Sequence, residues 1–264
     1  MIIGIIHPGS GLGDSLFSYI ATRVRAADLG VDFGFVGKEY FKGASFMNLD
    51  WGVQANISYT VDNNSGAVKP IYGGNEYKEY VLNKPYYNPE INFIPDGSVI
   101  DGYGAQDIRY FEHRLDEVRE WLKLKPEVWQ KYRPDQVPDY NCVINFRGGE
   151  YIGVPELFLP QEYWDKAIEI ITGKYKMMNF SVHTDDPETA KKFFPSYNPI
   201  KDIEANWVNI RYSQHLIISN SAFAILPALL NENVKEVIAP KFWAGRNVGE
   251  WRRPQNYYKK FTYI

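Results

Sequence analysis

The second half of the chain alternates between short apolar segments and amphipathic segments, and this alternation is the strongest constraint on how it can fold. The apolar segments have the length of buried strands and cover residues 141–146, 177–183, 216–219 and 235–239. Segments with helical spacing lie between them and cover residues 161–172, 187–194, 205–214 and 221–230. Strands that alternate with helices pair in parallel, because each helix returns the chain to the same edge of the sheet. We therefore expect a doubly wound parallel sheet in this half.

A similar pattern opens the chain. Residues 2–6 form a short, mostly β-branched run, which is typical of a strand buried on both faces. After a glycine-rich loop, apolar residues recur at spacings of three and four from Leu16 to Ala27, which predicts a helix. Gly30 is well placed to end this helix, and residues 31–36 predict a second strand. The order strand, loop, helix, strand predicts a second parallel sheet.

Two sheets imply two domains, for which 264 residues suffice. Residues 131–138 contain two prolines between ordered segments, and we expect the boundary there, which gives domains 1–134 and 135–264. In the first domain, residues 98–101 predict a further strand and residues 111–124 predict a helix. The preceding stretch, rich in Tyr, Asn, Gly and Pro, predicts no definite strands. The predicted fold class is α/β, with two Rossmann-like doubly wound domains that face a cleft.

Charge and cysteine content narrow the classes of function. Lys and Arg number 29 and Asp and Glu number 32, a net charge of -3, which argues against a protein that mainly grips a nucleic-acid backbone. Cys142 is the only cysteine, so the chain can form neither an internal disulfide nor a cysteine-based zinc site. No stretch approaches the roughly 18 apolar residues that span a bilayer, and the first residues do not form a secretory signal. We therefore expect a cytoplasmic protein without a transmembrane segment.

Aromatic residues are unusually frequent, at 16% of the chain. Tyr and Trp combine a flat apolar face with a polar group, which suits hydrated cyclic ligands, although a large core also uses them. The candidates for a sugar-stacking surface in the first half are Tyr40, Tyr72, Tyr77, Tyr80, Tyr86 and Tyr87. Those that we expect to lie in the core of the second half are Trp207, Phe223 and Trp243.

The loop Gly9-Ser-Gly11-Leu-Gly13-Asp14 lies between the first strand and its helix. Its glycines allow a ligand to approach the backbone closely, and a helix N-terminus favours an anion. A dinucleotide site is not expected, because Asp14 replaces a glycine of that fingerprint and Phe35-Val36-Gly37 offers no acid for a ribose. A tight turn that binds no ligand is the alternative.

Polar residues follow three predicted strands of the second half, where open α/β sheets bind ligands. Arg147, within Asn145-Phe-Arg-Gly-Gly-Glu-Tyr151, could present a fork of donors to phosphate oxygens or form a surface salt bridge. Asp186 can cap the helix that follows it, which leaves Asp185 free to contact a base or a ribose. The segment Ser219-Asn220-Ser221 could cradle a phosphate, cap the next helix, or do both.

Taken in order, these segments resemble the bacterial alpha-1,2-fucosyltransferases, the family 11 glycosyltransferases. The similar segments are Gly11–Gly13, Gly102-Tyr103, Arg109–Phe111, Asn145–Tyr151, Thr184–Pro187, Ile218–Phe223 and Ile238–Trp243. The fourth corresponds to the family's His-x-Arg-Arg-Gly-Asp-Tyr motif, with Asn145 for its histidine, Gly148 for its second arginine and Glu150 for its aspartate. The resemblance spans nearly the whole chain, which makes it more specific than any single motif.

The resemblance implies a GT-B-like fold and an inverting, metal-independent transferase that moves fucose from GDP-fucose to a hydroxyl of a glycan. It implies that Arg147 binds the donor diphosphate as the catalytic residue. The further donor-binding residues that it implies are Asn145, Asp185, Asp186, Ser219, Asn220 and Ser221. The candidates on the acceptor side, in the first domain, are His7, Gly11, Gly13, Asp14 and Tyr103.

The expected partners are thus a nucleotide-sugar donor and an oligosaccharide acceptor, with no metal, no separate cofactor and no nucleic acid. His7 and Asp14 are the candidates for a weak base near the acceptor hydroxyl. Two alternatives remain at this point. One is a transferase that uses another GDP-sugar, and the other is a relative that binds nucleotide or glycan without catalysis.

Overall fold

A computed structural model describes residues 1–55, 57–62, 67–71, 77–82, 87–243 and 258–264. The chain divides into two compact units, Met1–Leu124 and Lys125–Ile264. The division therefore falls ahead of the predicted boundary at residue 134. The reason is that helix α3 (Pro126–Tyr132) packs on helix α6 (Ile203–Tyr212) of the second unit. The Trp129 ring meets Tyr212 edge-on with centroids 5.4 Å apart, and Lys131 pairs with Glu204 at 2.9 Å.

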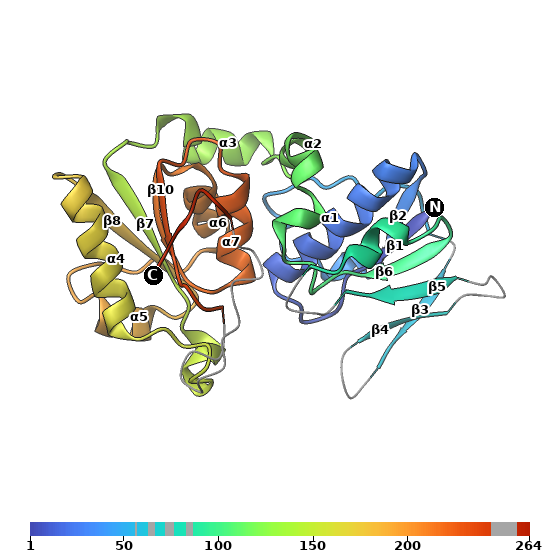
Figure 1. The fold of residues 1–264 in the computed structure, drawn as a ribbon, viewed down its shortest axis with the longest axis horizontal. Helices are drawn as coiled ribbons and strands as arrows, with labels where there is room; N and C mark the ends of the chain where they lie inside the picture. Colours follow the sequence, from blue (N-terminus) through green and yellow to red (C-terminus); the bar gives the residue numbers. More distant parts are fainter. Residues whose placement is uncertain (56, 63–66, 72–76, 83–86, 244–257) are drawn as a thin grey trace. The chain divides into compact units, whose positions relative to one another are not determined.

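The first unit contains a four-stranded parallel sheet in the order β2-β1-β6-β5 (Figure 1). Its strands are β1 (Ile2–Ile5), β2 (Phe33–Val36), β5 (Lys78–Val81) and β6 (Ser98–Asp101). Helix α1 (Leu12–Leu29) ends at Gly30, whose φ of 65° is the left-handed conformation that glycine adopts without strain. The predicted strands at both ends of this helix and the strand at 98–101 are confirmed.

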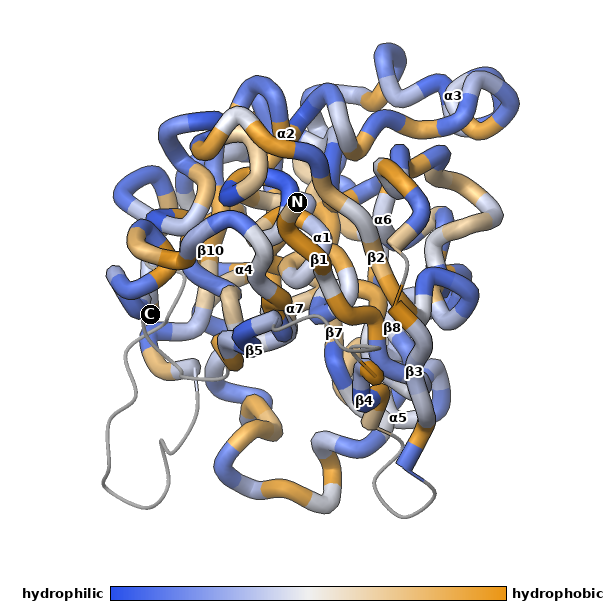
Figure 2. Tube along the Cα trace, turned by 90° about the vertical axis from the view of Figure 1, so that its right-hand side faces the viewer, coloured by the Kyte–Doolittle hydropathy of each residue, from blue (hydrophilic) through white to orange (hydrophobic). Residues whose placement is uncertain are grey.

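The two faces of this sheet are covered differently. A Cβ atom added to Gly4 would lie 2.5 Å from the hydroxyl of Thr22, so the absence of a side chain at Gly4 allows α1 to pack closely on one face. The opposite face carries Ile3 and Ile5, which pack with Val68. That valine begins β4 (Val68–Ile71), which pairs antiparallel with β3 (Ser58–Val61). Figure 2 shows β1 as a continuous hydrophobic segment, as expected for a strand covered on both faces.

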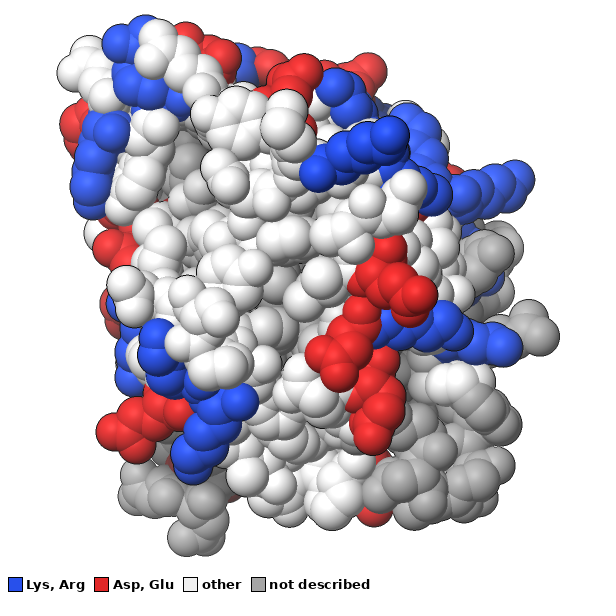
Figure 3. Space-filling model, turned by 90° about the vertical axis from the view of Figure 1, so that its left-hand side faces the viewer, with Lys and Arg blue, Asp and Glu red and all other residues white. Residues whose placement is uncertain are grey.

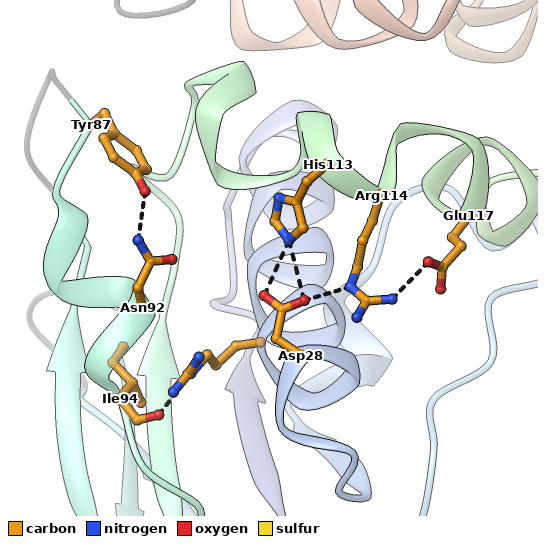
Figure 4. A network of polar contacts seen from close by, with 8 residues as sticks. Asp28, Tyr87, Asn92, Ile94, His113, Arg114 and Glu117 are labelled. Atoms are coloured by element: carbon orange, nitrogen blue, oxygen red, sulfur yellow. Dashed lines mark hydrogen bonds and ion pairs between the residues drawn. The ribbon is translucent and has the colours of Figure 1, made fainter.

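Polar contacts tie the segment after β6 back to α1 (Figure 4). Asp28, near the end of α1, accepts from Arg114 at 2.5 Å and lies 3.2 Å from the His113 ring nitrogen. Arg114 also donates to Glu117 of α2 (Leu115–Trp121). The helix predicted from 111 to 124 is therefore shorter and is preceded by a 3-10 turn. These contacts hold the far end of the loop that follows β6.

The second unit contains a five-stranded parallel sheet in the order β11-β10-β9-β7-β8. Its strands are β7 (Asn141–Phe146), β8 (Asn179–Thr184), β9 (His215–Ile218), β10 (Glu236–Ala239) and β11 (Thr262–Tyr263). Its helices besides α3 and α6 are α4 (Gln161–Lys174), α5 (Pro187–Phe193) and α7 (Ala222–Leu230). The predicted alternation is confirmed, although α4 extends beyond the predicted end at Thr172 to Lys174 and β11 was not predicted.

Short 3-10 helices complete the described structure at Lys38–Tyr40, Pro89–Phe93, Ile108–Tyr110, Glu112–Arg114, Pro134–Gln136 and Gly149–Gly153. The core of the second unit is aromatic where β7 meets α4, with the rings of Phe146 and Trp164 5.4 Å apart. Across the part of the chain that the structure describes, no helix is both long enough and apolar enough to cross a membrane.

Candidate functional site

The order of strands in the second unit creates a switch point between β7 and β9. The chain passes from β7 outward to β8 and then returns to the other side of β7 to form β9. Open α/β sheets bind their ligands beyond the carboxyl ends of the strands at such a point. Asn145 lies at the end of β7, and Ser219 directly follows β9. The polar residues singled out in the sequence thus border the position that the topology favours.

Asn145 and Ser219 contact each other across the switch point. Asn145 is paired in register with Ile218, and the Ser219 hydroxyl donates a hydrogen bond of 2.8 Å to the Asn145 side-chain oxygen. Both side chains are buried. Without this donor, the buried oxygen of Asn145 would have no partner to offset its loss of hydration. The hydrogen bond therefore stabilises the contact between the two strand ends.

Arg147 comes two residues after Asn145 and is two-thirds buried, with 29% of its side chain exposed. One terminal nitrogen, Nη1, lies 2.7 Å from Asp185, and the other, Nη2, donates to Glu150 at 2.9 Å. The guanidinium carbon lies 5.2 Å from the centre of the Tyr151 ring, which makes a cation–π contact. Among the described residues, the buried Nε of Arg147 has no hydrogen-bond partner. The salt-bridge alternative is therefore realised, and it leaves donor capacity on the same side chain.

Asp185 holds Arg147 from the turn after β8. Its Oδ1 accepts from the amide of Gly148 at 2.9 Å, while its Oδ2 faces Arg147. Both oxygens of Asp185 thus have a partner within the protein, and the contact of Asp185 with a base or a ribose stays a prediction. A Cβ atom on Gly149 would lie 2.4 Å from Asp185 Oδ2, and one on Gly148 would lie 2.7 Å from the Cβ of Asp186. The two glycines are what allow the turn after β8 to approach β7 this closely.

Asp186 caps helix α5, as predicted. Its Oδ1 accepts from the amide of Thr189 at 3.1 Å, and hydrogen bonding to Thr189 lowers the pKa of this carboxyl below its ordinary value. Asp186 thus has a structural function that accounts for its charge and position.

The segment after β9 leads into the N-terminus of α7. Asn220 donates from Nδ2 to the carbonyls of Leu157 and Trp243 at 3.0 Å and 2.7 Å, which fixes the segment. Ser221 stands at the N-cap position, but its side chain makes no capping hydrogen bond within the described part of the chain. The first amide groups of α7 therefore resemble those of an anion-binding helix terminus.

In the first unit, the corresponding position lies between β1 and β6, and His7 occupies it. The Nδ1 atom of His7 accepts from the amide of Val68 at 2.9 Å, so the hydrogen of the neutral ring is on Nε2. Nε2 lies 2.9 Å from Asp101 Oδ2 and donates to it. Both nitrogens are engaged, so His7 is oriented by its neighbours and is not poised as a free base.

The other acceptor-side candidates gather near His7. The Tyr103 ring meets His7 edge-on with centroids 6.3 Å apart, and Gln106 donates both to Asp14 and to the Tyr103 carbonyl. Gly11 directly precedes α1, and a Cβ atom there would lie 2.9 Å from Asp14 Oδ2. Gly13 is buried in the first turn of α1.

Sequence reasoning missed Asp101 and Gln106. For Asp101 a signal existed, because it ends a predicted strand and carboxyl ends of parallel strands meet at one edge of a sheet. Gln106 carried no such signal.

The aromatic candidates divide differently from the expectation. Tyr40 and Tyr77 pack against the hydrophobic core of the first unit, and the Tyr87 ring meets Tyr110. Tyr80 lies against Lys78, whereas Tyr72 and Tyr86 lie outside the described residues. In the second unit Trp207 is fully buried and meets Phe223, and Trp243 is partly buried. The sugar-stacking surface therefore stays a prediction.

Charge is mixed on the face shown in Figure 3, where basic and acidic side chains lie side by side. This face has no continuous basic surface of the kind that grips a nucleic-acid backbone. Among the described residues, no three or more His, Cys, Asp or Glu side chains are grouped so that they could hold a metal ion.

Comparison with family models and with curated proteins finds no match for this chain. Among solved structures, the fold is similar to that of the fucosyltransferase NodZ from Bradyrhizobium. One NodZ structure gives a TM-score of 0.53 at 14% identity and covers 97% of this chain and 98% of that chain. A second gives a TM-score of 0.50 at 12% identity and covers 89% and 94%. The likeness shows a fold of the GT-B type with two Rossmann-like domains, as predicted.

Proposed function

We propose that the protein is a glycosyltransferase that takes fucose from GDP-fucose and transfers it, with inversion and without a metal ion, to a glycan hydroxyl in an alpha-1,2 linkage. The observation that carries the proposal is the position of Arg147. Its guanidinium lies at the carboxyl end of β7, at the switch point of a parallel sheet. The NodZ structures that share this fold belong to a fucosyltransferase, which supports the choice of donor.

The chemistry assigns a role to each group around Arg147. Breaking the bond between the sugar and the diphosphate leaves negative charge on the phosphate oxygens. A fixed guanidinium at that position stabilises the transition state more than the ground state. The first amides of α7 are the neutral donors that we assign to the same phosphates, and Ser219 and Asn220 hold the segment that leads to them.

On the acceptor side, we assign His7, Asp101 and Tyr103 to the glycan. A hydrogen-bonded imidazole and carboxylate beside an aromatic ring match the polar edges and apolar face of a sugar. Asp101 holds the imidazole in one tautomer, and Val68 fixes its other nitrogen. Inversion requires the acceptor hydroxyl to approach the sugar from the side opposite to the diphosphate, so we expect the two groups of residues to bind different substrates.

The direct test is the affinity for GDP-fucose, measured by calorimetry for the native protein and for Arg147→Ala, together with the rate of transfer. We expect Arg147→Ala to lower kcat/KM by about 100-fold or more, the usual effect of losing a charge-stabilising donor. Arg133→Ala is the matched control, because Arg133 is an exposed arginine of the same unit that pairs only loosely with Asp135 at 3.6 Å. Equal affinity and equal turnover in the native protein and Arg147→Ala would overturn the assignment.

Donor identity and catalysis are tested separately. Competition among GDP-fucose, GDP-mannose and UDP-sugars measures the preference for the base and for the sugar. We expect GDP-fucose to bind most tightly, whereas a preference for a uridine nucleotide would contradict the proposal. Tight binding of GDP-fucose without transfer to any acceptor on a glycan array would favour a binding protein over an enzyme.

A further inference from the structure

Two carboxylates contact Arg147, and they differ in how firmly they are held. Asp185 has both oxygens engaged, one by the Gly148 amide and one by Arg147 Nη1, and its side chain is 29% exposed. Glu150 contacts Arg147 through Nη2, and its side chain is 76% exposed. The same guanidinium therefore has one partly buried partner with two contacts, Asp185, and one exposed partner, Glu150.

Asp185 has the properties of a positioning residue. Asp185 accepts from the backbone amide of Gly148, the residue that directly follows Arg147. The carboxylate therefore joins the Arg147 side chain to the backbone next to it. The space that Asp185 occupies exists because Gly149 has no side chain. Displacement of Asp185 would leave the Gly148 amide without its acceptor. We therefore expect Asp185 to stay in place when a ligand binds.

Glu150 has the opposite properties. An exposed ion pair is weak, because water solvates both partners well and the long side chain loses freedom when it is held. Glu150 nevertheless occupies Nη2, which is one of the two nitrogens with which an arginine grips a phosphate. A diphosphate carries more negative charge than one carboxylate, so it can displace Glu150 from Arg147. The bound diphosphate then lies beside the negative charge of Glu150, which repels it.

We infer that Glu150 is a built-in competitor of the donor diphosphate: it pairs with Arg147 in the empty site, is displaced on binding, and pairs again as the nucleoside diphosphate leaves. This inference rests on the proposed function, because it assigns the anion at Arg147 to a nucleotide. It predicts that Glu150 weakens the binding of donor and product, whereas Asp185 strengthens it. Two acidic residues in contact with one arginine thus have opposite effects on affinity.

The test compares Glu150→Gln, Asp185→Asn and the native protein in calorimetric titrations with GDP and, separately, with inorganic pyrophosphate. We expect Glu150→Gln to bind both anions about threefold to tenfold more tightly, which is the range of an exposed ion pair plus the relief of repulsion. We expect Asp185→Asn to bind both about tenfold more weakly. Glu169→Gln is the matched control, since it removes the same charge from an exposed position of α4, and we expect no change.

A second readout separates competition from a general structural effect. In an Arg147→Ala background, Glu150→Gln should no longer tighten pyrophosphate binding, because the residue acts only through Arg147. An equal gain in both backgrounds would overturn the inference.

The outcomes distinguish the inference from the proposed function. If native protein and Glu150→Gln bind GDP and pyrophosphate equally well, the inference fails and the proposed function stands. If Glu150→Gln tightens pyrophosphate binding but neither protein binds GDP, the inference about Arg147 stands and the guanosine nucleotide is wrong. If no variant binds either anion, both fail.

Discussion

The two units place different chemical groups at the same topological position. In the second unit, the switch point between β7 and β9 carries Arg147, whose cation is held by two carboxylates. In the first unit, the switch point between β1 and β6 carries His7 and Asp101, which form a hydrogen-bonded pair beside Tyr103. One site suits a phosphate, and the other suits hydroxyl groups and an apolar face.

The difference shows that a parallel sheet specifies where a site can form but not which ligand the site binds. The sheet brings loop residues from neighbouring strands together at one edge, whatever their chemistry. The residues at the strand ends then decide which ligand is bound. For a reaction between an anionic donor and a neutral acceptor, two such sheets supply two separate sites, and each can be altered without the other.

The largest expected effect comes from a substitution that alters the site of the first unit and leaves the site of the second unit unchanged. We expect Asp101→Asn to lower the rate of glycan transfer about 100-fold and to leave GDP affinity unchanged. The Asp101 carboxylate accepts from His7 Nε2–H at 2.9 Å and fixes the orientation of the ring that we assign to the glycan, whereas an amide in its place can turn an NH2 donor toward the same nitrogen. Initial rates at several acceptor concentrations, together with calorimetry of GDP binding, measure the two quantities.

The control for this prediction is Asp32→Asn, which removes a charge from an exposed position of the same unit. A loss of GDP affinity in Asp101→Asn would mean that the two switch points do not bind separate substrates. That result would contradict the proposal that the first unit binds the glycan and the second unit binds the nucleotide.

The next effect tests the glycines beside Arg147, where we propose that the phosphates bind. We expect Gly149→Ala to destabilise the protein by about 1–3 kcal/mol and to weaken GDP binding. Gly149 has a φ of +44°, and a Cβ atom there would lie 2.4 Å from the carboxylate that holds Arg147. Urea unfolding and calorimetry measure the two effects.

Gly153→Ala is a matched control from the same 3-10 helix, since a Cβ atom there meets no atom within 4 Å. We expect it to change the free energy of unfolding by less than about 0.5 kcal/mol. Equal effects of the two substitutions would show that contact with Asp185 is not what requires glycine at position 149.

Sequence periodicity predicted the sheets well for a physical reason. Strands buried on both faces are uninterrupted apolar runs, and the helices between them carry start and stop residues. The strand β11 escaped prediction because it has only two residues and depends on pairing with β10. The boundary was displaced because the packing of Trp129 on Tyr212 joins residues that are far apart in sequence.

In the second unit, the residues around Arg147 could be singled out from the sequence, but their pairing could not. Arg147, Asp185 and Ser219 were all identified from their places after predicted strands. That Asp185 grips Arg147 depends on the register of β7 with β8 and on the space beside Gly149, and neither is a local property of the sequence. The partnership of His7 with Asp101 likewise depends on β6 lying next to β1.

A smaller effect tests the bond across the switch point of the second unit. We expect Ser219→Ala to lower the free energy of unfolding by about 1–3 kcal/mol, because the buried oxygen of Asn145 loses its donor. Ser221→Ala, two residues away, should cost less than about 0.5 kcal/mol, since Ser221 makes no capping bond within the described residues. Urea denaturation of both variants measures the contrast. If Ser221→Ala costs as much as Ser219→Ala, the bond to Asn145 is not the source of the difference.

The smallest effect concerns His183, which lies beside Asn145 in the register of β7 and β8. Asn206 donates from Nδ2 to the Thr184 carbonyl, so its oxygen faces His183 and accepts from Nδ1–H at 2.8 Å. The Nε2 atom is buried without a partner among the described residues. Burial lowers the pKa of His183, because a second proton would place an unpaired charge inside the protein.

Because the pKa of His183 is lowered in the folded protein, we expect acid to lower the free energy of unfolding. Below about pH 6.5 the unfolded chain gains a proton at this position that the folded chain does not, so acid shifts the equilibrium toward unfolding. We expect the unfolding free energy of the native protein to fall more steeply below pH 6.5 than that of His183→Gln, with the roughly 1.4 kcal/mol per pH unit of one proton as the upper limit of the difference. Urea unfolding of both proteins across this range gives the two slopes, and parallel slopes would contradict the prediction. A flatter slope in the variant would show that His183 stays neutral in the folded protein, in contrast to Arg147, whose charge is paired with Asp185 and Glu150.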